Sequence, residues 1–294
     1  MSALIECVPN FSEGRDAAAI AALRAAVEST AGVALLDQTS DIDHHRTVLT
    51  FAGSPEAVLE AAVRVAGVAV ERIDLRRHAG GVHPRIGALD VCPLVPVRDV
   101  TLDRCAELAH WLGNRLWLEH DVPVYFYEAA ALEESRRKLE DVRRQAGREF
   151  TPDLGGPTHH PSAGATVVGA RKFLIAYNVN LATGNLAVAR QIAGRIRESG
   201  GGLRAVKALG LPLASSGLVQ VSMNLVDFEV TPVERVFQTV QEAAAGLGVE
   251  VVDSELIGLA PAAALNEALA RRIKLRDWSP AMILENRLAT LHLD

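Results

Sequence analysis

The hydrophobic pattern of the chain begins with a strand-like run followed by a helix-like stretch. The run LIECVP has the partly alternating apolar positions of a β-strand and ends in NFSEG. Asp16 is then a candidate N-cap, and Ile20, Leu23 and Val27 lie on one helical stripe. The pattern therefore predicts a strand, a turn and an amphipathic helix.

A similar junction occurs in the second half of the chain. The strand-like run FLIAYNV ends in NLATG, and Asn185 is the candidate cap of a stretch with Val188, Ile192 and Ile196 on one stripe. Both junctions read Asn, apolar, x, x, Gly. We interpret this as a structural repeat.

Each half also contains a second helix start. Ser54-Pro55 follows RTVLTFAG, and Thr231-Pro232 follows LVQVSMNLVDFEV. A hydroxyl cap followed by proline favours the first turn of a helix, where the missing N–H costs nothing. Thr231 and Glu234 also fit a capping box.

This order of elements predicts an α+β protein of two ferredoxin-like βαββαβ subdomains, residues 1–170 and 171–294, with helices on one face of each sheet. We expect the two sheets to face a central cleft or tunnel, which would be the default ligand site. The alternative is a coincidental similarity of two α/β patterns, because the repeat does not extend beyond the junctions.

Composition narrows the class of protein. The chain has 294 residues, 49% of them hydrophobic, a net charge of −6 and three widely spaced cysteines. Its basic residues are scattered, which argues against nucleic-acid binding. The sequence shows neither a signal peptide nor an apolar run long enough for a bilayer. We predict a soluble, cytoplasmic protein with reduced cysteines and no membrane partner.

The segment RHAGGVHPRIGALD, residues 77–90, contains candidate chemistry. Pro84 biases His83 toward an extended backbone, and Arg85 would share a face with His83 in an extended segment. An imidazole beside an anion-binding group is a plausible acid–base site. The alternative is a loop histidine that bonds only to its own turn.

A second cluster, DQTSDIDHHRT, offers Asp41, Asp43, His44, His45 and Arg46 just before a strand. Carboxylates and imidazoles this close could bind a metal, but the usual metal-ligand spacings do not occur. A hydrogen-bonding site for a polar ligand and a charge-rich surface turn are the other readings. We predict no metal.

Three further features are less specific. The segment QAGREFTPDLGGPTHHPSAGATVVGA predicts a long irregular loop, either a linker or a ligand-binding segment. The stretch EESRRKLEDVRRQ before it predicts a solvated helix with i,i+4 pairs. Asn178 and Asn180 alternate along one strand face, which is typical of either a functional site or an edge strand.

Together, ECVPNFSEGRD, HRTVLTFAG, HPRIGALDVCPLVPV, VPVYFYEAA, GATVVGARKFLIAYNVNL and VSMNLVDFEVTP closely resemble the formiminotransferase family over almost the whole chain. The resemblance implies two α/β subdomains around a tunnel, a homodimer, and transfer of a formimino group from N-formimino-L-glutamate to N5 of tetrahydrofolate in histidine degradation. Tetrahydrofolate is then the acceptor substrate. Animal members carry an additional cyclodeaminase domain, which we expect on a separate chain here.

The resemblance also implies site residues. The family's catalytic histidine corresponds to His83, and its folate-binding segment corresponds to part of a loop at about 151–165. The predicted folate- or substrate-binding residues are Gly155, Gly156, Pro157, Thr158, His159, His160, Pro161, Ser162, Ala163, Gly164, Asp41, Asp43, His44, Arg46, Arg85, Asn10, Asn178 and Asn180.

This sequence departs from the animal members at two of these places. Ala163 stands where they often have a tryptophan, and Thr39 stands where they have an acidic residue. Three alternatives stay open: N-formyl-glutamate as the donor, a folate-binding module without catalysis, and a metal-dependent hydrolase.

Overall fold

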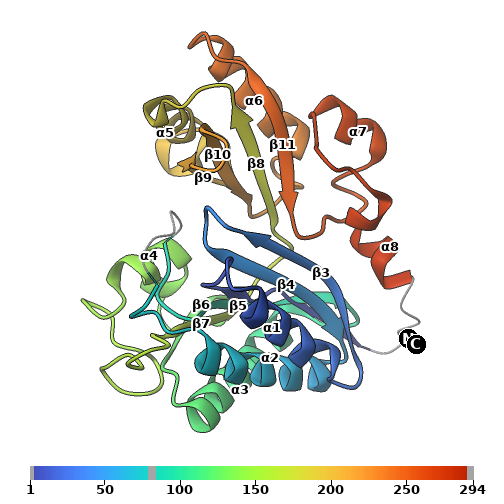
Figure 1. Ribbon diagram of the computed structural model, residues 1–294. Helices are drawn as coiled ribbons and strands as arrows, with labels where there is room; N and C mark the ends of the chain where they lie inside the picture. The colour runs from blue at the N-terminus through green and yellow to red at the C-terminus, as the bar shows by residue number, and fades with distance from the viewer. Residues whose placement is uncertain (1–2, 79–83, 290–294) are drawn as a thin grey trace. The chain divides into compact units, whose positions relative to one another are not determined.

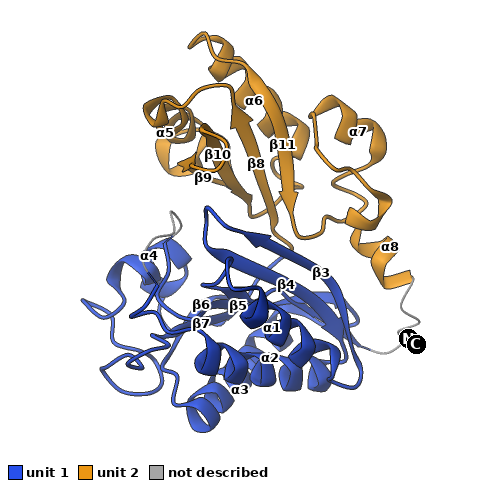
Figure 2. Ribbon diagram, in the orientation of Figure 1, with its two compact units in different colours: residues 1–172, 293–294 blue, residues 173–292 orange. Residues whose placement is uncertain are grey.

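The computed structural model describes residues 3–78 and 84–289. The chain divides into two compact units, residues 1–172 with 293–294 and residues 173–292 (Figure 2). Each unit has its own sheet and its own hydrophobic core. The units are therefore described one at a time.

Unit 1 begins with a βαββαβ arrangement. Its elements are β1 (Leu4–Cys7), β2 (Asn10–Phe11), α1 (Ala17–Glu28), β3 (Val33–Asp41), β4 (Arg46–Gly53), α2 (Pro55–Arg72) and β5 (Leu89–Arg98). Strands β1 and β2 lie between β4 and β5, and β3 pairs with β4, all antiparallel. This order is compatible with a ferredoxin-like unit.

An extension then widens the sheet of unit 1 to seven strands. It contains α3 (Leu102–His120), β6 (Val124–Glu128), a 3₁₀ turn (Glu134–Arg136), α4 (Leu139–Gln145) and β7 (Thr166–Ala170). Strand β7 pairs in parallel with both β5 and β6. The prediction had no place for these two added strands.

Helices α1, α2 and α3 cover one face of this sheet, and α4 lies on the other (Figure 1). Val142 of α4 packs with Tyr125, Tyr127 and Val167 in a small second core. Phe126, between the two tyrosines, belongs to the main core on the opposite face. The expectation that helices cover one face only is therefore wrong for unit 1.

Unit 2 repeats the βαββαβ order without an added strand. Its elements are β8 (Ile175–Leu181), α5 (Leu186–Ile196), a 3₁₀ turn (Glu198–Gly200), β9 (Val206–Leu213), β10 (Leu218–Leu225), α6 (Val233–Ala245), β11 (Val251–Ile257), α7 (Glu267–Arg272), a 3₁₀ turn (Pro280–Met282) and α8 (Leu284–Ala289). The sheet order is β11-β8-β10-β9, all antiparallel. The predicted α+β class with two sheets is confirmed.

Three of the four predicted helix caps occur in the structure. The side chains of Asp16, Ser54 and Asn185 each accept a backbone N–H in the first turn of α1, α2 and α5. The predicted capping box at Thr231 is wrong. Its hydroxyl donates to the Arg204 carbonyl at 2.6 Å, and α6 begins one residue later, after Pro232.

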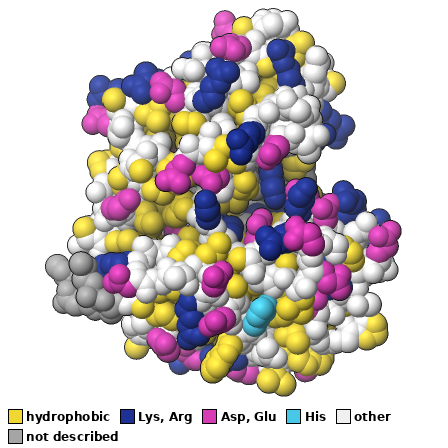
Figure 3. Space-filling view, turned by 180° about the vertical axis from the view of Figure 1, so that it is seen from behind, with side chains coloured by type: hydrophobic (Ala, Val, Ile, Leu, Met, Phe, Trp, Pro, Cys, Tyr) yellow, Lys and Arg dark blue, Asp and Glu magenta, His cyan; other side chains and the backbone are white. Residues whose placement is uncertain are grey.

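Side chains of both charge signs are interspersed over the face in Figure 3. Within residues 3–78 and 84–289, no helix combines the length and the hydropathy that a bilayer crossing requires. All three cysteines are buried thiols, and the Sγ atoms of Cys7 and Cys92 lie 3.6 Å apart.

Glu6 of β1 gives unit 1 a pH-dependent element. Burial raises the pKa of this carboxyl from 4.5 to about 7, and the charge of Arg171 opposes the rise. Between these values the folded protein holds a proton that the unfolded chain releases, so the stability that it confers is lost as pH rises through about 7.

Glu6→Gln is therefore expected to remove the loss of stability that wild type shows as pH rises from 4.5 to about 7. The measurement is the free energy of unfolding in urea, well below and well above the Glu6 pKa. The difference between wild type and variant should grow in favour of the variant as pH rises. A difference that is constant with pH would contradict the assignment.

Candidate active site

A buried carboxylate forms the centre of the candidate site in unit 1. Asp90 of β5 has 0% exposure and accepts hydrogen bonds from the side chains of Arg46 at 2.8 Å and Arg143 at 2.5 Å, and from the backbone N–H of Ile86 at 2.8 Å. Burial alone would raise the pKa of Asp90, but the two guanidinium groups outweigh it and lower the pKa. The carboxylate is therefore ionised and paired.

Arg46 and Arg85 each contact a described residue next to the predicted catalytic segment in sequence. The Arg46 guanidinium also donates to the Asn10 side-chain oxygen at 3.1 Å and to the Pro84 carbonyl at 3.0 Å. Arg85 Nη2 donates to the His78 carbonyl at 3.0 Å. Burial lowers the pKa of Arg46 to about 10, so it stays a cation at neutral pH. His83 itself lies outside the described residues.

The predicted DQTSDIDHHRT cluster forms the turn between β3 and β4. Asp41 accepts from the backbone N–H of His44 at 2.6 Å, and its carboxylate lies 2.9 Å from His44 Nδ1. Burial would raise the pKa of Asp41, but these His44 contacts lower it overall. Asp43 lies in the same turn and is partly buried. Asp41 and His44 thus pair with each other, whereas Arg46 points to Asp90.

The imidazole of His45 lies near Glu13 rather than Asp41. Its Nδ1 lies 3.4 Å from Glu13 Oε1, and His78 Nε2 lies 3.2 Å from Glu13 Oε2. The two imidazole rings stack with centroids 4.7 Å apart and planes at 13°. Among the described residues, Glu13, His45 and His78 form the one group close enough to suggest a metal site.

The predicted folate loop follows α4 and has no regular helix or strand. Its middle, Gly156 to Thr158, is exposed, whereas Ala163 is 2% exposed and packs into the main core. His159 Nε2 lies 2.9 Å from the Tyr125 hydroxyl. Of the remaining predicted loop residues, Pro161 is exposed and Gly155, His160, Ser162 and Gly164 are partly buried.

The end of this loop lies directly beside the segment that follows His83 in sequence. Ala88 N–H donates to the Ala163 carbonyl at 2.8 Å, and Ala165 N–H donates to the Ile86 carbonyl at 3.0 Å. A Cβ on Gly164 would lie 2.2 Å from the Ile86 oxygen, and Gly164 has φ +73°. Glycine is required there because the two backbones are in contact. The structure thus brings two predicted site segments together.

Unit 2 places the predicted asparagines in a network of side-chain amides and carboxylates on β8, β10 and β11. Asn178 Nδ2 donates to Glu255 at 2.9 Å, and Asn180 Nδ2 donates to Asp253 at 2.7 Å. Gln220 Nε2 donates to both Asn180 and Glu255, at 3.0 and 2.8 Å. Arg276 also pairs with Glu255. Because β8 lies between β10 and β11, an edge-strand origin of these asparagines is wrong.

Residues 4–171 match the formiminotransferase domain, N-terminal subdomain, and residues 176–282 match the formiminotransferase domain. The chain belongs to the formiminotransferase family. The glutamate formimidoyltransferase of Streptococcus pyogenes serotype M1 is 42% identical over 98% of this chain and 99% of its own length. The glutamate formimidoyltransferase of Thermoplasma acidophilum is 40% identical over 97% of each chain.

The formimidoyltransferase-cyclodeaminase of Gallus gallus is 46% identical over 93% of this chain, which covers 53% of the bird protein. This formiminotransferase therefore spans about half of that relative.

Several residues of the candidate site escaped the sequence reasoning. The stretch EESRRKLEDVRRQ is not one solvated helix but a 3₁₀ turn and α4, and two of its arginines point inward. Arg143 pairs with Asp90, and Arg136 pairs with Asp153 at 2.7 Å. One feature of the sequence could have identified Asp90, because it is a carboxylate inside the apolar run ALDVCPLV. Arg136 and Arg143 had no such feature.

Proposed function

We propose that this protein is a glutamate formimidoyltransferase, which moves the formimino group of N-formimino-L-glutamate to N5 of tetrahydrofolate in histidine degradation. One observation supports this above all: relatives with this name are 40–42% identical over 97–98% of the chain. In this reaction the N5–C bond forms and the C–N bond to glutamate breaks. A proton leaves N5 and a proton arrives on the glutamate nitrogen.

His83 is the proposed catalytic imidazole. Proton transfer of this kind needs a group that titrates near neutral pH, and histidine is the usual one. The next residue, Pro84, has its carbonyl held by Arg46, which Asp90 in turn holds by a buried ion pair. The residue that follows His83 in the chain is therefore anchored through a buried ion pair, and acid–base catalysis requires that the reacting groups be held in place.

The loop of residues 155–164 is the proposed folate-binding segment. Its exposed middle leaves main-chain groups available to a ligand, and its end contacts residues 86–88. Asn10, Asp41, Asp43, His44, Arg46 and Arg85 are proposed to bind folate or formiminoglutamate through polar contacts in unit 1. Asn178 and Asn180 are proposed to contribute from unit 2, where a carboxylate-backed amide network fixes their orientation.

The decisive experiment supplies purified protein with tetrahydrofolate and formiminoglutamate and follows formation of the formimino-folate chromophore. A parallel reaction with N-formyl-glutamate compares kcat/KM for the two donors. A third reaction contains a strong chelator, and full activity in it would exclude a required metal. If neither donor gives turnover, the proposal is overturned.

The proposal also covers the location, the oligomeric state and the metal requirement of the protein. We infer a cytoplasmic homodimer that needs no metal. Sedimentation of the purified protein measures the oligomeric state.

The hydroxyl of Tyr125 gives a test of the folate loop. It donates to the Phe150 carbonyl at 3.1 Å, accepts from Gly147 N–H at 3.0 Å and lies 2.9 Å from His159 Nε2. Tyr125→Phe removes these three contacts and is expected to raise KM for tetrahydrofolate about tenfold, because their loss loosens the loop. Steady-state kinetics measures KM, and KM for formiminoglutamate is the internal control. An unchanged KM for tetrahydrofolate would contradict the assignment.

A further inference from the structure

Glu13 is a buried carboxylate placed between two imidazoles, apart from the Asp90 ion pairs. It follows β2, its side chain is almost fully buried, and its Oε1 accepts the backbone N–H groups of Arg15 at 2.7 Å and Asp16 at 2.9 Å. Burial would raise the pKa of Glu13, but these bonds and the nearby histidines lower it overall. Glu13 is therefore an anion held in a fixed orientation.

The hydrogen bonds around Glu13 decide the tautomers of both histidines. Gly14 N–H donates to His45 Nδ1 at 3.0 Å, so that nitrogen carries a lone pair and donates nothing to Glu13. Burial lowers the pKa of His45, and the charges of Arg15 and Arg85 act in the same direction, which favours its neutral form. His78 Nε2 lies 3.2 Å from Glu13 Oε2, and because a carboxylate can only accept, we place a proton on this nitrogen.

This tautomer leaves the second nitrogen of His78 as a base. With the proton on Nε2, Nδ1 carries a lone pair, and Nδ1 is a buried atom without a hydrogen-bond partner in the described structure. The His78 side chain as a whole is 13% exposed. A carboxylate that orients an imidazole and leaves its other nitrogen free is the arrangement of a general base.

The stacking of the two rings argues against a metal as the occupant. Imidazole lone pairs lie in the ring plane, and the planes of His45 and His78 are 13° from parallel with centroids 4.7 Å apart. Two nearly parallel stacked rings do not direct their lone pairs at one point, as ligands of one ion must.

We propose that His78 is a second acid–base group of the formimino transfer, with Glu13 as its positioning residue. This rests on the proposed function. In the reaction the N5–C bond forms and the C–N bond to glutamate breaks, and Nδ1 of His78 takes the proton that leaves N5. The protonated imidazole of His83 delivers a proton to the leaving glutamate nitrogen, so one proton is taken up and one is given. Exchange with water then returns both imidazoles to their starting state. The charged or titratable groups around His78 are Glu13, His45, Arg15 and Arg85.

The test compares His78→Gln and Glu13→Gln with wild type. His78→Gln is expected to lower kcat about 10²–10⁴-fold, with the dissociation constant of tetrahydrofolate, measured by anaerobic calorimetry, unchanged. Glu13→Gln keeps an acceptor for the N–H groups of Arg15 and Asp16 but removes the charge beside His78. The acidic limb of its kcat/KM profile should therefore move to lower pH, which a merely structural role would not cause.

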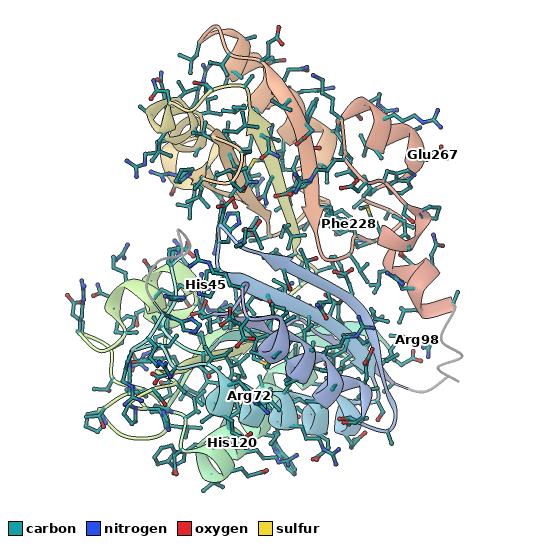
Figure 4. The ribbon with its side chains drawn as sticks, viewed as in Figure 1. His45, Arg72, Arg98, His120, Phe228 and Glu267 are labelled. Carbon is teal, nitrogen blue, oxygen red and sulfur yellow. The ribbon has the colours of Figure 1, made fainter. Side chains whose placement is uncertain are left out.

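His120→Gln is the matched control. His120 ends α3, its Nε2 contacts the Val63 carbonyl of α2 at 2.9 Å, and it lies apart from His45 in Figure 4. Wild-type kcat in His78→Gln would overturn the proposal. If His78→Gln does not fold, an unmoved acidic limb in Glu13→Gln overturns it.

Loss of wild-type activity with a chelator, with recovery on adding Zn²⁺, would overturn it in favour of a metal site. Absence of turnover in the wild type overturns the proposed function and this proposal together. Turnover that persists without His78 overturns this proposal alone.

Discussion

Replacing His83 with alanine is expected to lower kcat about 10²–10⁴-fold while the affinity for tetrahydrofolate is unchanged. The methyl group cannot deliver a proton to the leaving glutamate nitrogen, so the loss falls on the transition state rather than on binding. Stopped-flow or steady-state formation of the formimino-folate chromophore gives kcat, and calorimetry under anaerobic conditions gives the dissociation constant.

His110→Ala is the control for removing an imidazole. His110 lies on α3, and its Nε2 contacts the Ala130 carbonyl at 2.8 Å, away from the Asp90 ion pairs. The His110→Ala variant should have a lower free energy of unfolding than wild type but the same kcat. Added imidazole should restore part of the activity of His83→Ala and none to the control. A wild-type kcat in His83→Ala would contradict the assignment.

Structural features that depend on contacts within a few residues, such as helix caps, were predictable from the sequence. The caps at Asp16, Ser54 and Asn185 each bond to a backbone N–H two or three residues ahead, so the residue type and its position suffice. Thr231 carries the same signal, but its hydroxyl bonds to the Arg204 carbonyl, 27 residues away. A tertiary partner thus replaced the local one.

The candidate site was predictable only in part, for the same reason. The sequence marks Arg46 and the segment from Arg77 to Asp90 as polar features near strands, but not that they meet. Arg46 and Asp90 are 44 positions apart, and Arg143 is a further 53 positions on. Their contact depends on the pairing of β2 with both β4 and β5 and on α4 covering the second face of the sheet.

The contacts between Glu13, His45 and His78 were likewise not predictable from local sequence. His45 was visible in DQTSDIDHHRT as one of several charged residues beside a strand. Its partners lie in two other segments: Glu13 in ECVPNFSEGRD, and His78 in RHAGGVHPRIGALD, where the sequence drew attention to His83 and Arg85 instead. Hydrophobic periodicity reports burial of a face, whereas the pairing of buried polar groups is decided by tertiary structure.

Asp90→Asn is expected to destabilise the protein by about 3–5 kcal/mol, because it leaves the buried guanidinium groups of Arg46 and Arg143 without their shared anion. The amide oxygen can still accept one hydrogen bond but cannot balance two positive charges. The measurement is the free energy of unfolding in urea at neutral pH. Arg143→Met in the Asp90→Asn background should restore part of the loss, since one unpaired buried cation is removed.

The pH dependence of the stability difference between wild type and Asp90→Asn separates the contribution of the Asp90 charge from that of its packing. The pKa of Asp90 is lowered in the folded state, so its contribution is present above the unfolded value and is lost as pH falls through the folded value. The stability gap between wild type and Asp90→Asn should therefore narrow in acid. Asp74→Asn is the matched control, since Asp74 also pairs with an arginine, Arg76, but at the surface, where solvent screens the pair. If the two variants lose equal stability, or the gap stays constant with pH, burial of the Asp90 charge is not what stabilises this part of unit 1.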